Sequence, residues 1–419
     1  MTKKVYVLNG ARTPFLKAGS DFREVSAVDL GRSASVEAMA RSGITPDAVD
    51  QSIFGNIATP PDAANIARIV ALRSGVPKER PAHSVSRNCA SGIEAVVQAA
   101  RLIQTGEAGV VLAGGVENMS LIPFLYREGV KQALTAAGMA KTTGARVKAF
   151  AGLPWGQLLN PVIGLKEGLT DPVCDLNMGE TAELLAKEGG ITREQQDRFA
   201  CRSHNRAEAN AARLAEEIVP VPIPPAFDRV ATEDNGIRKG QSVEALGKLK
   251  PFFDRKFGTV TAGNSSQITD GGAALVIAGE DFVKAHGLKP IGRIVSWGFA
   301  GLEPERMGLG PSRSTPPALK AAGLTMKEIG LVEMNEAFAA QVLANLIAFE
   351  KDPALGPIAD ENLNPNGGAI ALGHPVGSSG ARLILTLLYE MRRRKKTPFG
   401  LATLCIGGGQ GATIVLEAV

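Results

Sequence analysis

The sequence predicts an α/β protein made of two similar halves, and three observations lead to this prediction. Short apolar segments alternate with helical patterns, the same order of motifs returns near the C-terminus, and the middle of the chain breaks the alternation. Alternating strands and helices are the pattern of α/β architectures. A chain of 419 residues is long enough for two or three structural units with a substantial core.

The first half shows the alternation most clearly. The expected elements are a strand at Val5–Asn9, a helix at Ala27–Arg41, a strand at Gln51–Asn56, a helix at Gly92–Gln104 and a strand at Ala108–Ala113. The helical segments carry apolar residues three or four positions apart, whereas the strands are short apolar runs.

The order of the first half recurs in three matched segments. Ser42-Gly43-Ile44-Thr45 resembles Ala322-Gly323-Leu324-Thr325, Cys89-Ala90-Ser91-Gly92 resembles Gly377-Ser378-Ser379-Gly380, and Val111-Leu112-Ala113-Gly114-Gly115 resembles Leu404-Cys405-Ile406-Gly407-Gly408. Counted between first residues, the spacings are 322 − 42 = 280, 377 − 89 = 288 and 404 − 111 = 293. Each match is weak by itself, but three in the same order indicate an ancient duplication.

The middle of the chain interrupts this pattern. Val219–Pro225 carries four prolines in seven residues, which excludes a continuous helix and favours an extended connector. The sequence therefore predicts a first half from residues 1–118 and 251–283, an inserted region at 119–250, and a second half at 284–419.

Charge and cysteine content exclude several classes of function. Lys and Arg number 46 against 42 Asp and Glu, too small an excess for nucleic-acid binding, which concentrates basic residues in a patch. The four cysteines form no CxxC pair, so neither a zinc site nor a disulfide framework is expected. Without a leader-like start or an apolar run near the ~18 residues that span a bilayer, the sequence predicts a cytoplasmic protein or an already processed organellar form.

The first candidate site is Cys89, which precedes the expected helix at Gly92–Gln104. A thiol near the positive end of a helix dipole favours its thiolate form and so becomes a better nucleophile. The alternative is a buried cysteine that serves as a small apolar residue. This local context alone leaves both interpretations open.

The second candidate is His374, within Asn364-Pro365-Asn366-Gly367-Gly368-Ala369-Ile370-Ala371-Leu372-Gly373-His374-Pro375. The glycines allow a close approach of the backbone to a ligand, and a neutral imidazole can take the proton from a cysteine. A structural histidine is the alternative.

Two further motifs carry chemical groups. Cys405 is followed by Gly407-Gly408-Gly409, which places a thiol beside exposed N–H groups that can hold a developing oxyanion. Asn335 and Glu336 stand at an expected strand-to-helix step. A tight turn with an inert thiol and a helix N-cap are the respective alternatives.

Together, the two cysteine motifs and the Asn-x-x-Gly-Gly-x-x-x-x-Gly-His-Pro motif resemble the thiolase family in content and order, over essentially the whole chain. The resemblance implies the thiolase fold: duplicated βαβαβαββ halves in a layered α/β/α/β/α arrangement with an inserted loop domain. The active site is then expected where the halves meet.

The resemblance also implies a role for each group. Cys89 takes the acyl group, His374 deprotonates Cys89, and Cys405 exchanges a proton with the α-carbon of acetyl-CoA. One oxyanion hole consists of His374 and a water held by Asn335, and the other of the N–H groups of Cys89 and Gly407. No metal or redox cofactor is implied, since coenzyme A enters as a substrate.

Three more positions match residues that bind substrate in the family. Ser266, in Thr261-Ala262-Gly263-Asn264-Ser265-Ser266, corresponds to a contact with the pantetheine arm of coenzyme A. Met178 and Phe338 correspond to residues that line the acyl pocket. Without the resemblance, both would be taken for ordinary core residues.

The implied reaction is cleavage of 3-ketoacyl-CoA by coenzyme A, or the reverse condensation of two acetyl-CoA. The middle region resembles the thiolase subunits of fatty-acid oxidation trifunctional complexes, whereas Asn335 and the segment 405–409 resemble the common acetoacetyl-CoA and 3-ketoacyl-CoA thiolases. The alternatives are an enzyme restricted to acetoacetyl-CoA, a decarboxylating condensing enzyme of the same superfamily, and a non-catalytic acyl-CoA-binding subunit.

The segment 121–165 combines apolar ends with a basic middle. Such a segment can rest on an anionic membrane surface or on a hydratase–dehydrogenase subunit. A lid over the active site, or packing within an oligomer, is the simpler alternative. Family members assemble as dimers or tetramers, so a homodimer or homotetramer is expected.

Overall fold

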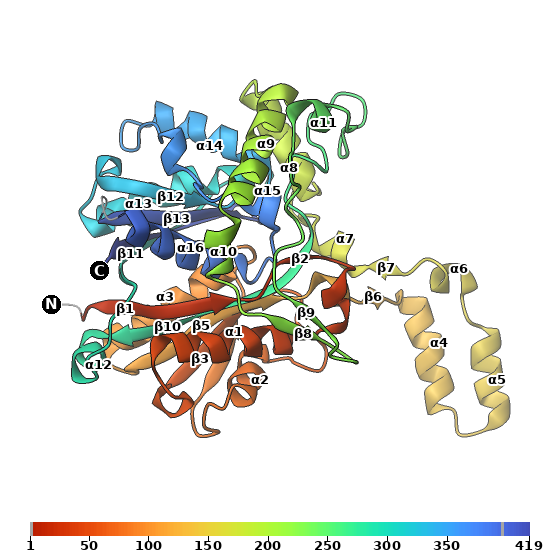
Figure 1. Ribbon diagram of the computed structural model, residues 1–419. Coiled ribbons are helices and arrows are strands. Elements are labelled where there is room, and N and C mark those ends of the chain that lie inside the picture. Colours follow the sequence, from red (N-terminus) through yellow and green to blue (C-terminus); the bar gives the residue numbers. More distant parts are fainter. Residues whose placement is uncertain (1–2, 395–397) are drawn as a thin grey trace.

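The computed structural model describes residues 3–394 and 398–419, and its strands form one large mixed sheet. The strand order is β12-β13-β14-β11-β1-β10-β5-β3-β4, with the short β2 also paired to β10. The sheet folds back on itself where β1 meets β11, through three residue pairs only. Helices α3 and α16 lie between its two parts (Figure 1). The predicted layered α/β/α/β/α fold is confirmed.

The first half supplies one part of the sheet. Its elements are β1 (Val5–Arg12), β2 (Leu16–Lys17), α1 (Ala27–Ser42), β3 (Gln51–Gly55), α2 (Ile66–Arg73), β4 (Ala82–Val85), α3 (Ser91–Thr105), β5 (Val110–Glu117), β10 (Thr269–Gly279) and α12 (Glu280–Ala285). The sequence predicted five of these elements, β1, α1, β3, α3 and β5, within a few residues of their observed ends, except that β1 and β5 run further.

The second half repeats this order. Its elements are β11 (Gly292–Gly301), α13 (Gly310–Ala322), β12 (Ile329–Met334), α14 (Ala339–Lys351), α15 (Ala369–Leu372), α16 (Ser379–Arg394), β13 (Phe399–Ile406) and β14 (Gln410–Ala418). Strand pairing agrees in direction between the halves: β1–β10–β5–β3–β4 corresponds to β11–β14–β13–β12, and a parallel bridge from Val332 to Leu363 stands where β3 pairs with β4.

The buried core has three layers of contacts. Side chains of α3, α16 and the inner faces of both sheet parts form the central cluster. Helices α1 and α2 cover the outer face of the first half, and α13 and α14 cover that of the second half. Burial of these amphipathic faces is the main driving force for this arrangement.

The segments that were matched by sequence do not all occupy equivalent positions in the two halves. Gly43 and Gly323 end α1 and α13 with the same left-handed backbone, φ 69° and ψ 27°, so this match is confirmed in detail. The third match was wrong in register, because Gly115 lies inside β5 whereas Gly408 lies in the turn after β13. A Cβ on Gly115 would overlap the Gly377 carbonyl oxygen, while Gly408 needs its positive φ of 90°.

The inserted region carries small elements of its own. They are β6 (Phe124–Leu125), α4 (Glu128–Met139), α5 (Thr143–Ala151), α6 (Trp155–Leu158), β7 (Val162–Ile163), α7 (Gly164–Gly168), α8 (Met178–Glu188), α9 (Arg193–Ala209), α10 (Ala211–Ala215), β8 (Val221–Ile223), β9 (Arg229–Ala231) and α11 (Val243–Gly247). The connector Val219–Pro225 contains β8, in keeping with its predicted extended form.

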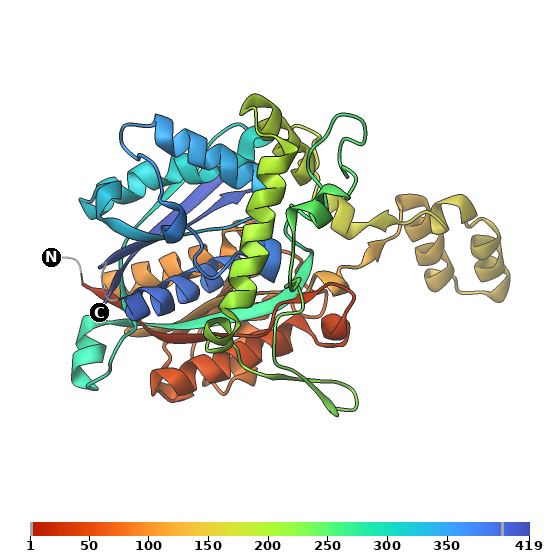
Figure 2. The ribbon, with the colours of Figure 1, turned by 45° about the horizontal axis from the view of Figure 1, so that its top comes forward.

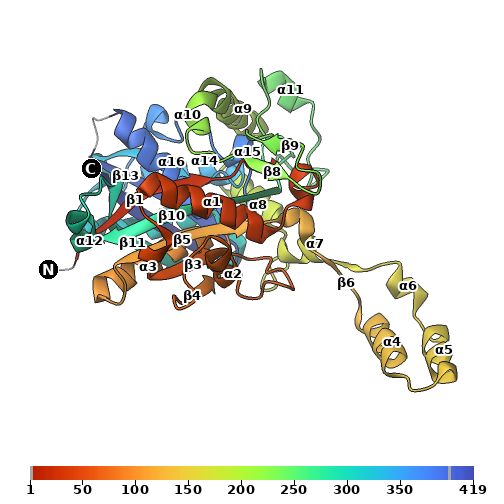
Figure 3. The same cartoon turned by 60° about the horizontal axis from the view of Figure 1, so that its bottom comes forward.

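A helical hairpin projects from the body. Strands β6 and β7 pair as a two-stranded stalk, and α4, α5 and α6 form its tip, away from the main sheet (Figures 1 and 3). Helix α9 lies across the side of the molecule instead, beside the second half (Figure 2). Within the described residues, no helix is both long and apolar enough to cross a membrane.

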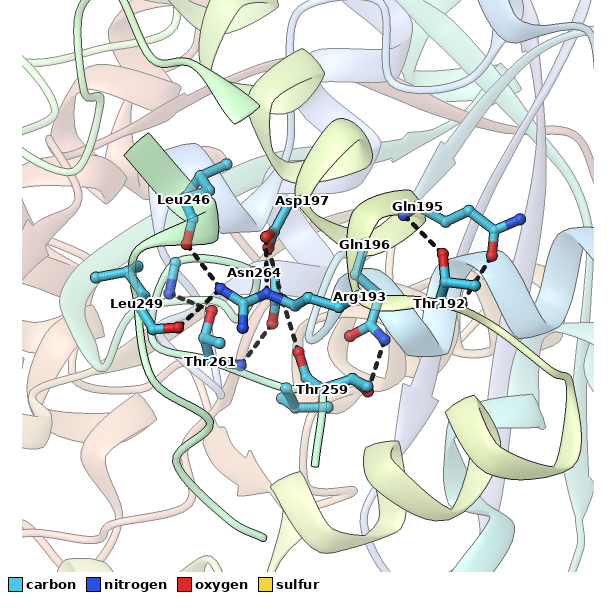
Figure 4. Close-up of polar contacts among 12 residues, drawn as sticks. Thr192, Arg193, Gln195, Gln196, Asp197, Leu246, Leu249, Thr259, Thr261 and Asn264 are labelled. Carbon is cyan, nitrogen blue, oxygen red and sulfur yellow. Dashed lines mark hydrogen bonds and ion pairs between the residues drawn. The ribbon is translucent and has the colours of Figure 1, made fainter. Parts of the chain in front are cut away.

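Residues 251–268 pack against the inserted region, although the sequence assigned them to the first half. Asn264 Nδ2 donates to Asp197 Oδ1 (3.0 Å), and Gln196 Nε2 donates to Thr259 Oγ1 (2.8 Å), as Figure 4 shows. Arg193 closes this contact by donating to the carbonyl oxygens of Leu246 and Leu249. Pairing with the first-half sheet starts only at β10.

Candidate active site

A cavity of about 780 Å³ opens where the two halves and the inserted region meet. Its walls come from the loop before α3, the end of β5, the segment around α7, the start of α8 and the turn between β13 and β14. Lining residues include Cys89, Glu117, Met119, Leu169, Met178 and Gly407. Most of the wall is apolar, which suits a ligand with a hydrocarbon part.

Cys89 lies in a turn that ends at α3. Asn88 adopts a left-handed backbone (φ 43°) and donates through Nδ2 to the Gly407 carbonyl oxygen (2.8 Å), which joins the turn to the second half. Burial raises the pKa of the Cys89 thiol, and the N–H groups of Gly407 and Cys89 itself, which point at the sulfur, lower it by less. Desolvation of the buried sulfur therefore opposes the helix-end effect that the sequence suggested.

Cys405 lies near the end of β13, 1% exposed, within an apolar cluster that includes Met178 and Phe338. Burial raises the pKa of its thiol well above the usual range, and the neighbouring Cys89 raises it further. The hydrogen bond from Asn88 to Gly407 joins the residue before Cys89 to the residue two after Cys405. The structure thus brings together the segments of two thiols that are 316 residues apart in sequence (405 − 89 = 316).

His374 is buried, and burial lowers its pKa to about 4. Its Nδ1 lies 2.6 Å from Ser379 Oγ, and the Ser379 hydroxyl donates to the Pro375 carbonyl oxygen (3.0 Å). Because that hydroxyl proton is used, Nδ1 carries the proton that Ser379 accepts, and Nε2 keeps a free lone pair. Nε2 has no hydrogen-bond partner among the described residues. A neutral imidazole with this tautomer can act as a base.

Asn335 follows β12 and is completely buried. Its main-chain N–H donates to the Thr403 carbonyl oxygen (2.9 Å), which fixes its position beside β13. Both polar atoms of its side chain lack a partner within the described part of the chain. An unpaired buried amide is costly, so it fits a site that receives a water or a ligand.

Two of the three predicted substrate-binding residues, Met178 and Phe338, pack in the same apolar cluster as Cys405. Met178 begins α8, and a Cβ on Gly407 would lie 3.2 Å from its sulfur. Phe338 packs edge-on against Phe253, with ring centroids 6.1 Å apart. The half-buried Ser266 donates its N–H to the Ala337 carbonyl oxygen (2.9 Å), one residue before Phe338.

The predicted residues fall into two groups, those that line the cavity and those that lie outside its lining. Cys89, Met178 and Gly407 line the cavity, with Cys405 behind them; His374, Asn335, Ser266 and Phe338 are not among its lining residues. The backbone brings the histidine segment near the nucleophile, since Gly377 and Gly380 approach α3 so closely that a Cβ on Gly92 would overlap Ala381.

Sequence reasoning missed two polar groups. Ser379 sets the tautomer of His374, and Glu117 lines the cavity at the end of β5. A carboxylate directly after an apolar Gly-Gly strand is a signal for Glu117, but its partners are distant in sequence and left no local pattern.

Comparison with known proteins decides the family. Residues 5–281 match the model of the thiolase N-terminal domain, and residues 288–418 match that of the thiolase C-terminal domain. The chain belongs to the thiolase family.

Relatives of this thiolase span its whole length. It is 41% identical to a 3-ketoacyl-CoA thiolase of Enterobacter sp. (strain 638), over 99% of this chain and 97% of that protein. It is 40% identical to a 3-ketoacyl-CoA thiolase of Yersinia enterocolitica, with the same coverage.

Two solved structures share the fold. The crystal structure of the Bacillus anthracis acetyl-CoA acetyltransferase matches with a TM-score of 0.88 at 35% identity, over 100% of this thiolase and 99% of that chain. Human mitochondrial 3-ketoacyl-CoA thiolase in complex with CoA matches with a TM-score of 0.87 at 37% identity, over 100% and 98%. The family therefore holds over both halves and the insertion.

Proposed function

We propose that this thiolase cleaves 3-ketoacyl-CoA with coenzyme A, giving acetyl-CoA and a shortened acyl-CoA, and also catalyses the reverse condensation. The observation that carries the proposal is the contact of the Cys89 turn with the turn after Cys405, through the hydrogen bond from Asn88 to Gly407, where the histidine loop also meets the nucleophile turn. The relatives named 3-ketoacyl-CoA thiolase support the same substrate class.

In the cleavage direction, His374 Nε2 takes the proton of Cys89, whose sulfur attacks the 3-keto carbon. The bond between C2 and C3 then breaks, and its electron pair forms the enolate of acetyl-CoA, which takes a proton from the Cys405 thiol. The acyl group remains on Cys89 as a thioester. Coenzyme A then gives its thiol proton to the Cys405 thiolate and displaces the acyl group, and the Cys89 thiolate that leaves takes back its proton from His374, which restores all three groups.

Oxyanions in these steps need donors. The N–H groups of Cys89 and Gly407, which already point at the Cys89 sulfur, suit the oxygen on the acyl carbon. A water held by the unpaired amide of Asn335 beside His374 suits the enolate oxygen. One such donor contributes about 3 kcal/mol to transition-state stabilisation. Ser266, Met178 and Phe338 are proposed to contact the pantetheine arm and the acyl group.

The cavity favours substrates longer than acetoacetyl-CoA. Beyond Cys89 its wall continues with apolar residues of the insertion: Met119, Ile122, Leu165, Leu169 and Val173. An enzyme restricted to the four-carbon substrate has no use for such a wall. The presence of both thiols, the imidazole and the amide also disfavours a non-catalytic subunit.

Coenzyme A-dependent cleavage of 3-ketoacyl-CoAs from four to sixteen carbons tests the proposal. We expect activity along the series. Cleavage of the four-carbon substrate alone would restrict the enzyme to acetoacetyl-CoA, and no cleavage of any member would leave a binding subunit. We infer that coenzyme A serves only as substrate, that no metal or redox cofactor takes part, and that the enzyme acts in the cytoplasm.

We infer a homodimer or homotetramer that uses the free edge of β4. Among the described strands, it pairs with β3 on one side only, and its residues are partly exposed. An exposed edge strand offers unpaired backbone groups to a second chain. Light scattering coupled to size-exclusion chromatography should give at least twice the mass of 43.7 kDa.

We propose that the hairpin at 121–165 docks on an anionic membrane surface. Its helices α4, α5 and α6 extend away from the body (Figure 3), and the segment exposes Phe124 (69%), Met139 (77%) and Trp155 (62%). Its net charge is five basic minus one acidic residue, +4. Apolar side chains together with basic charge match a lipid interface.

Co-sedimentation with phosphatidylglycerol vesicles tests this docking. Strands β6 and β7 hold residues 125 and 162 side by side, so a short Gly-Ser turn can replace residues 127–160 without pulling on the body. The wild-type protein should bind and the shortened protein should not. Equal, negligible binding would exclude the membrane; capture of a hydratase–dehydrogenase subunit by the wild type alone would assign the hairpin to that partner.

A further inference from the structure

Glu117 is a buried carboxylate that joins the two halves next to the nucleophile. It ends β5, is 1% exposed, and accepts four hydrogen bonds, two at each oxygen. Oε1 accepts from Asn56 Nδ2 (3.0 Å) and the Ala58 N–H (2.9 Å); Oε2 accepts from the Ile57 N–H (3.1 Å) and the Gly377 N–H (2.9 Å).

The fourth donor distinguishes this group from an ordinary buried acid. Residues 56–58 belong to the first half, but Gly377 belongs to the second, in the loop that runs from His374 to α16. Gly377 also matches Cys89 in the duplication, so Glu117 holds the counterpart of the nucleophile. Glu117, Ile57, Ala58 and Val376 all line the cavity that contains Cys89.

We propose that Glu117 is a positioning residue that fixes the His374 loop against the Cys89 turn. The inference rests on the proposed function of the site. Glu117 does not touch the reacting atoms; it acts through Gly377, which is joined to His374 by only Pro375 and Val376. Because reacting groups lose about 100-fold in rate for a 1 Å displacement, an anchor at this distance controls proton transfer.

The anchor is stronger when Glu117 is ionised. A carboxylate accepts all four N–H groups, whereas a protonated carboxyl turns an O–H toward one of them. Burial raises the pKa of Glu117 to about 7, the N–H groups of Ala58, Gly377 and Ile57 lower it by less, and the charge of Asp270 on β10 raises it. The charge of Glu117 in turn raises the pKa of the Cys89 thiol. The rate of acylation should therefore fall as the pH drops below about 7.

Glu117→Gln tests the proposal, because it keeps the size of the side chain but replaces one acceptor oxygen by a donor. We expect kcat to fall about 10- to 100-fold with KM within about twofold, and the acid limb near pH 7 to disappear. Alkylation of Cys89 by iodoacetamide should shift to lower pH, since a neighbouring negative charge is gone. This readout needs no substrate, so it separates failure of the inference from failure of the proposed function.

Glu183→Gln is the matched control. Glu183, on α8, also accepts main-chain N–H groups of a loop, those of Thr259 and Val260, but it lies outside the Cys89 cavity. It should lower the melting temperature and leave kcat and the acid limb unchanged. Equal loss of kcat in both variants, or a Glu117→Gln enzyme with the wild-type pH profile, would overturn the proposal.

If Glu117→Gln does not fold, two measurements remain. Single-turnover acylation of the wild-type enzyme should show the limb near pH 7, far above the pKa of about 4 for His374. Glu117→Asp retains the charge on a shorter side chain, so it should keep the limb with a reduced kcat. A wild-type rate that is flat from pH 6 to 8 would contradict the inference.

Discussion

The two halves share one order of strands and helices but differ in the link between their last two strands. In the first half, the chain leaves β5 at Glu117 and returns in β10 only at Thr269. In the second half, β13 and β14 are joined by Gly407, Gly408 and Gly409 alone. The same position in the duplicated scaffold therefore holds a whole inserted region in one half and a tight turn in the other.

This difference is what makes the junction a site. The tight turn brings the N–H of Gly407 to the Cys89 sulfur and leaves Cys405 beside it. The insertion supplies the wall opposite, including Met178 and Leu169. Two symmetric halves would have two equal links at this junction. Because the links are unequal, the short turn lies beside the nucleophile, and the long insertion encloses the cavity from the other side.

The largest effect on activity should come from Cys89, whose counterpart in the second half is Gly377, a residue without a reactive side chain. Cys89→Ser should lower acylation by at least about 10⁴-fold, because a serine hydroxyl is a far weaker nucleophile than a thiol at this base. Mass spectrometry after incubation with acetyl-CoA measures it. Cys174→Ser, another partly exposed thiol, is the control. Acyl label on Cys174 or Cys201 would reverse the assignment.

The next largest effect concerns the thiol of the tight turn. Cys405→Ser should still form the acyl-enzyme, because Cys89 and His374 are intact, but should lose cleavage and condensation about 10³-fold for want of the proton carrier. Acyl-enzyme formation and steady-state turnover must be measured on one preparation. Loss of both to the same degree would mean that the two thiols do not have separate tasks.

An asparagine follows the strand in both halves, and only in the second half does its side-chain NH2 group lack a partner among the described residues. Asn56 donates to Val116 and Glu117, whereas both side-chain atoms of Asn335 lack a partner among the described residues. Asn335→Ala should lower kcat about 100-fold and leave the free energy of unfolding unchanged or slightly higher. Asn345→Ala removes a buried amide that is hydrogen-bonded, so it should lower the free energy of unfolding and leave kcat unchanged. An unstable Asn335→Ala protein with normal kcat would refute a role at the oxyanion.

The glycines that the sequence matched wrongly should differ in cost. Gly115→Ala places a methyl group against the Gly377 backbone and should destabilise the fold by about 3 kcal/mol or more. Gly408→Ala meets no atom within 4 Å and should cost about 1 kcal/mol, the strain of a positive φ. Urea unfolding of both variants gives the comparison. Equal destabilisation would mean that the two glycines serve the same purpose after all.

The smallest effect is a pH dependence from the histidine loop. In the duplication, His374 of the second half corresponds to Ser86 of the first half. Ser86 is exposed, whereas His374 is buried. The folded-state pKa of His374 is about 4 against 6.5 unfolded, so below pH 6.5 the unfolded chain takes up a proton first and stability falls toward pH 4. Between pH 7.5 and 5.5, His374 should account for about 1.4 kcal/mol of lost stability.

That loss should appear as a pH-dependent difference in unfolding free energy between wild type and His374→Asn, measured by urea unfolding at both pH values. Burial raises the pKa of Glu117 to about 7 and that of Glu333 to about 8, so the stability that these two groups contribute to the protein falls as the pH rises. Both groups are present in wild type and variant, so their contributions cancel in the difference. His286→Asn, at an exposed position, is the control and should leave the difference at zero.

Much of the fold and half of the site followed from local patterns. Helix α1 and strand β3 were predicted nearly to the residue, because apolar periodicity and a terminal glycine act within one element. The placement of residues 251–268 was not predictable in this way, since it depends on bonds such as Asn264 to Asp197, which join segments 67 residues apart. The register of Gly115 was missed because glycine in a strand and glycine in a turn look alike in one dimension.

The sequence by itself determined the order of the motifs, the residue types that can carry thioester chemistry and the resemblance that they form together. Only the tertiary structure decided that burial raises the pKa of the Cys89 thiol, that His374 Nε2 has no partner among the described residues, and that Glu117 ties the halves together. The physical reason is range: helix and turn preferences act over a few residues, whereas desolvation and a bond from residue 117 to residue 377 exist only once the chain has packed.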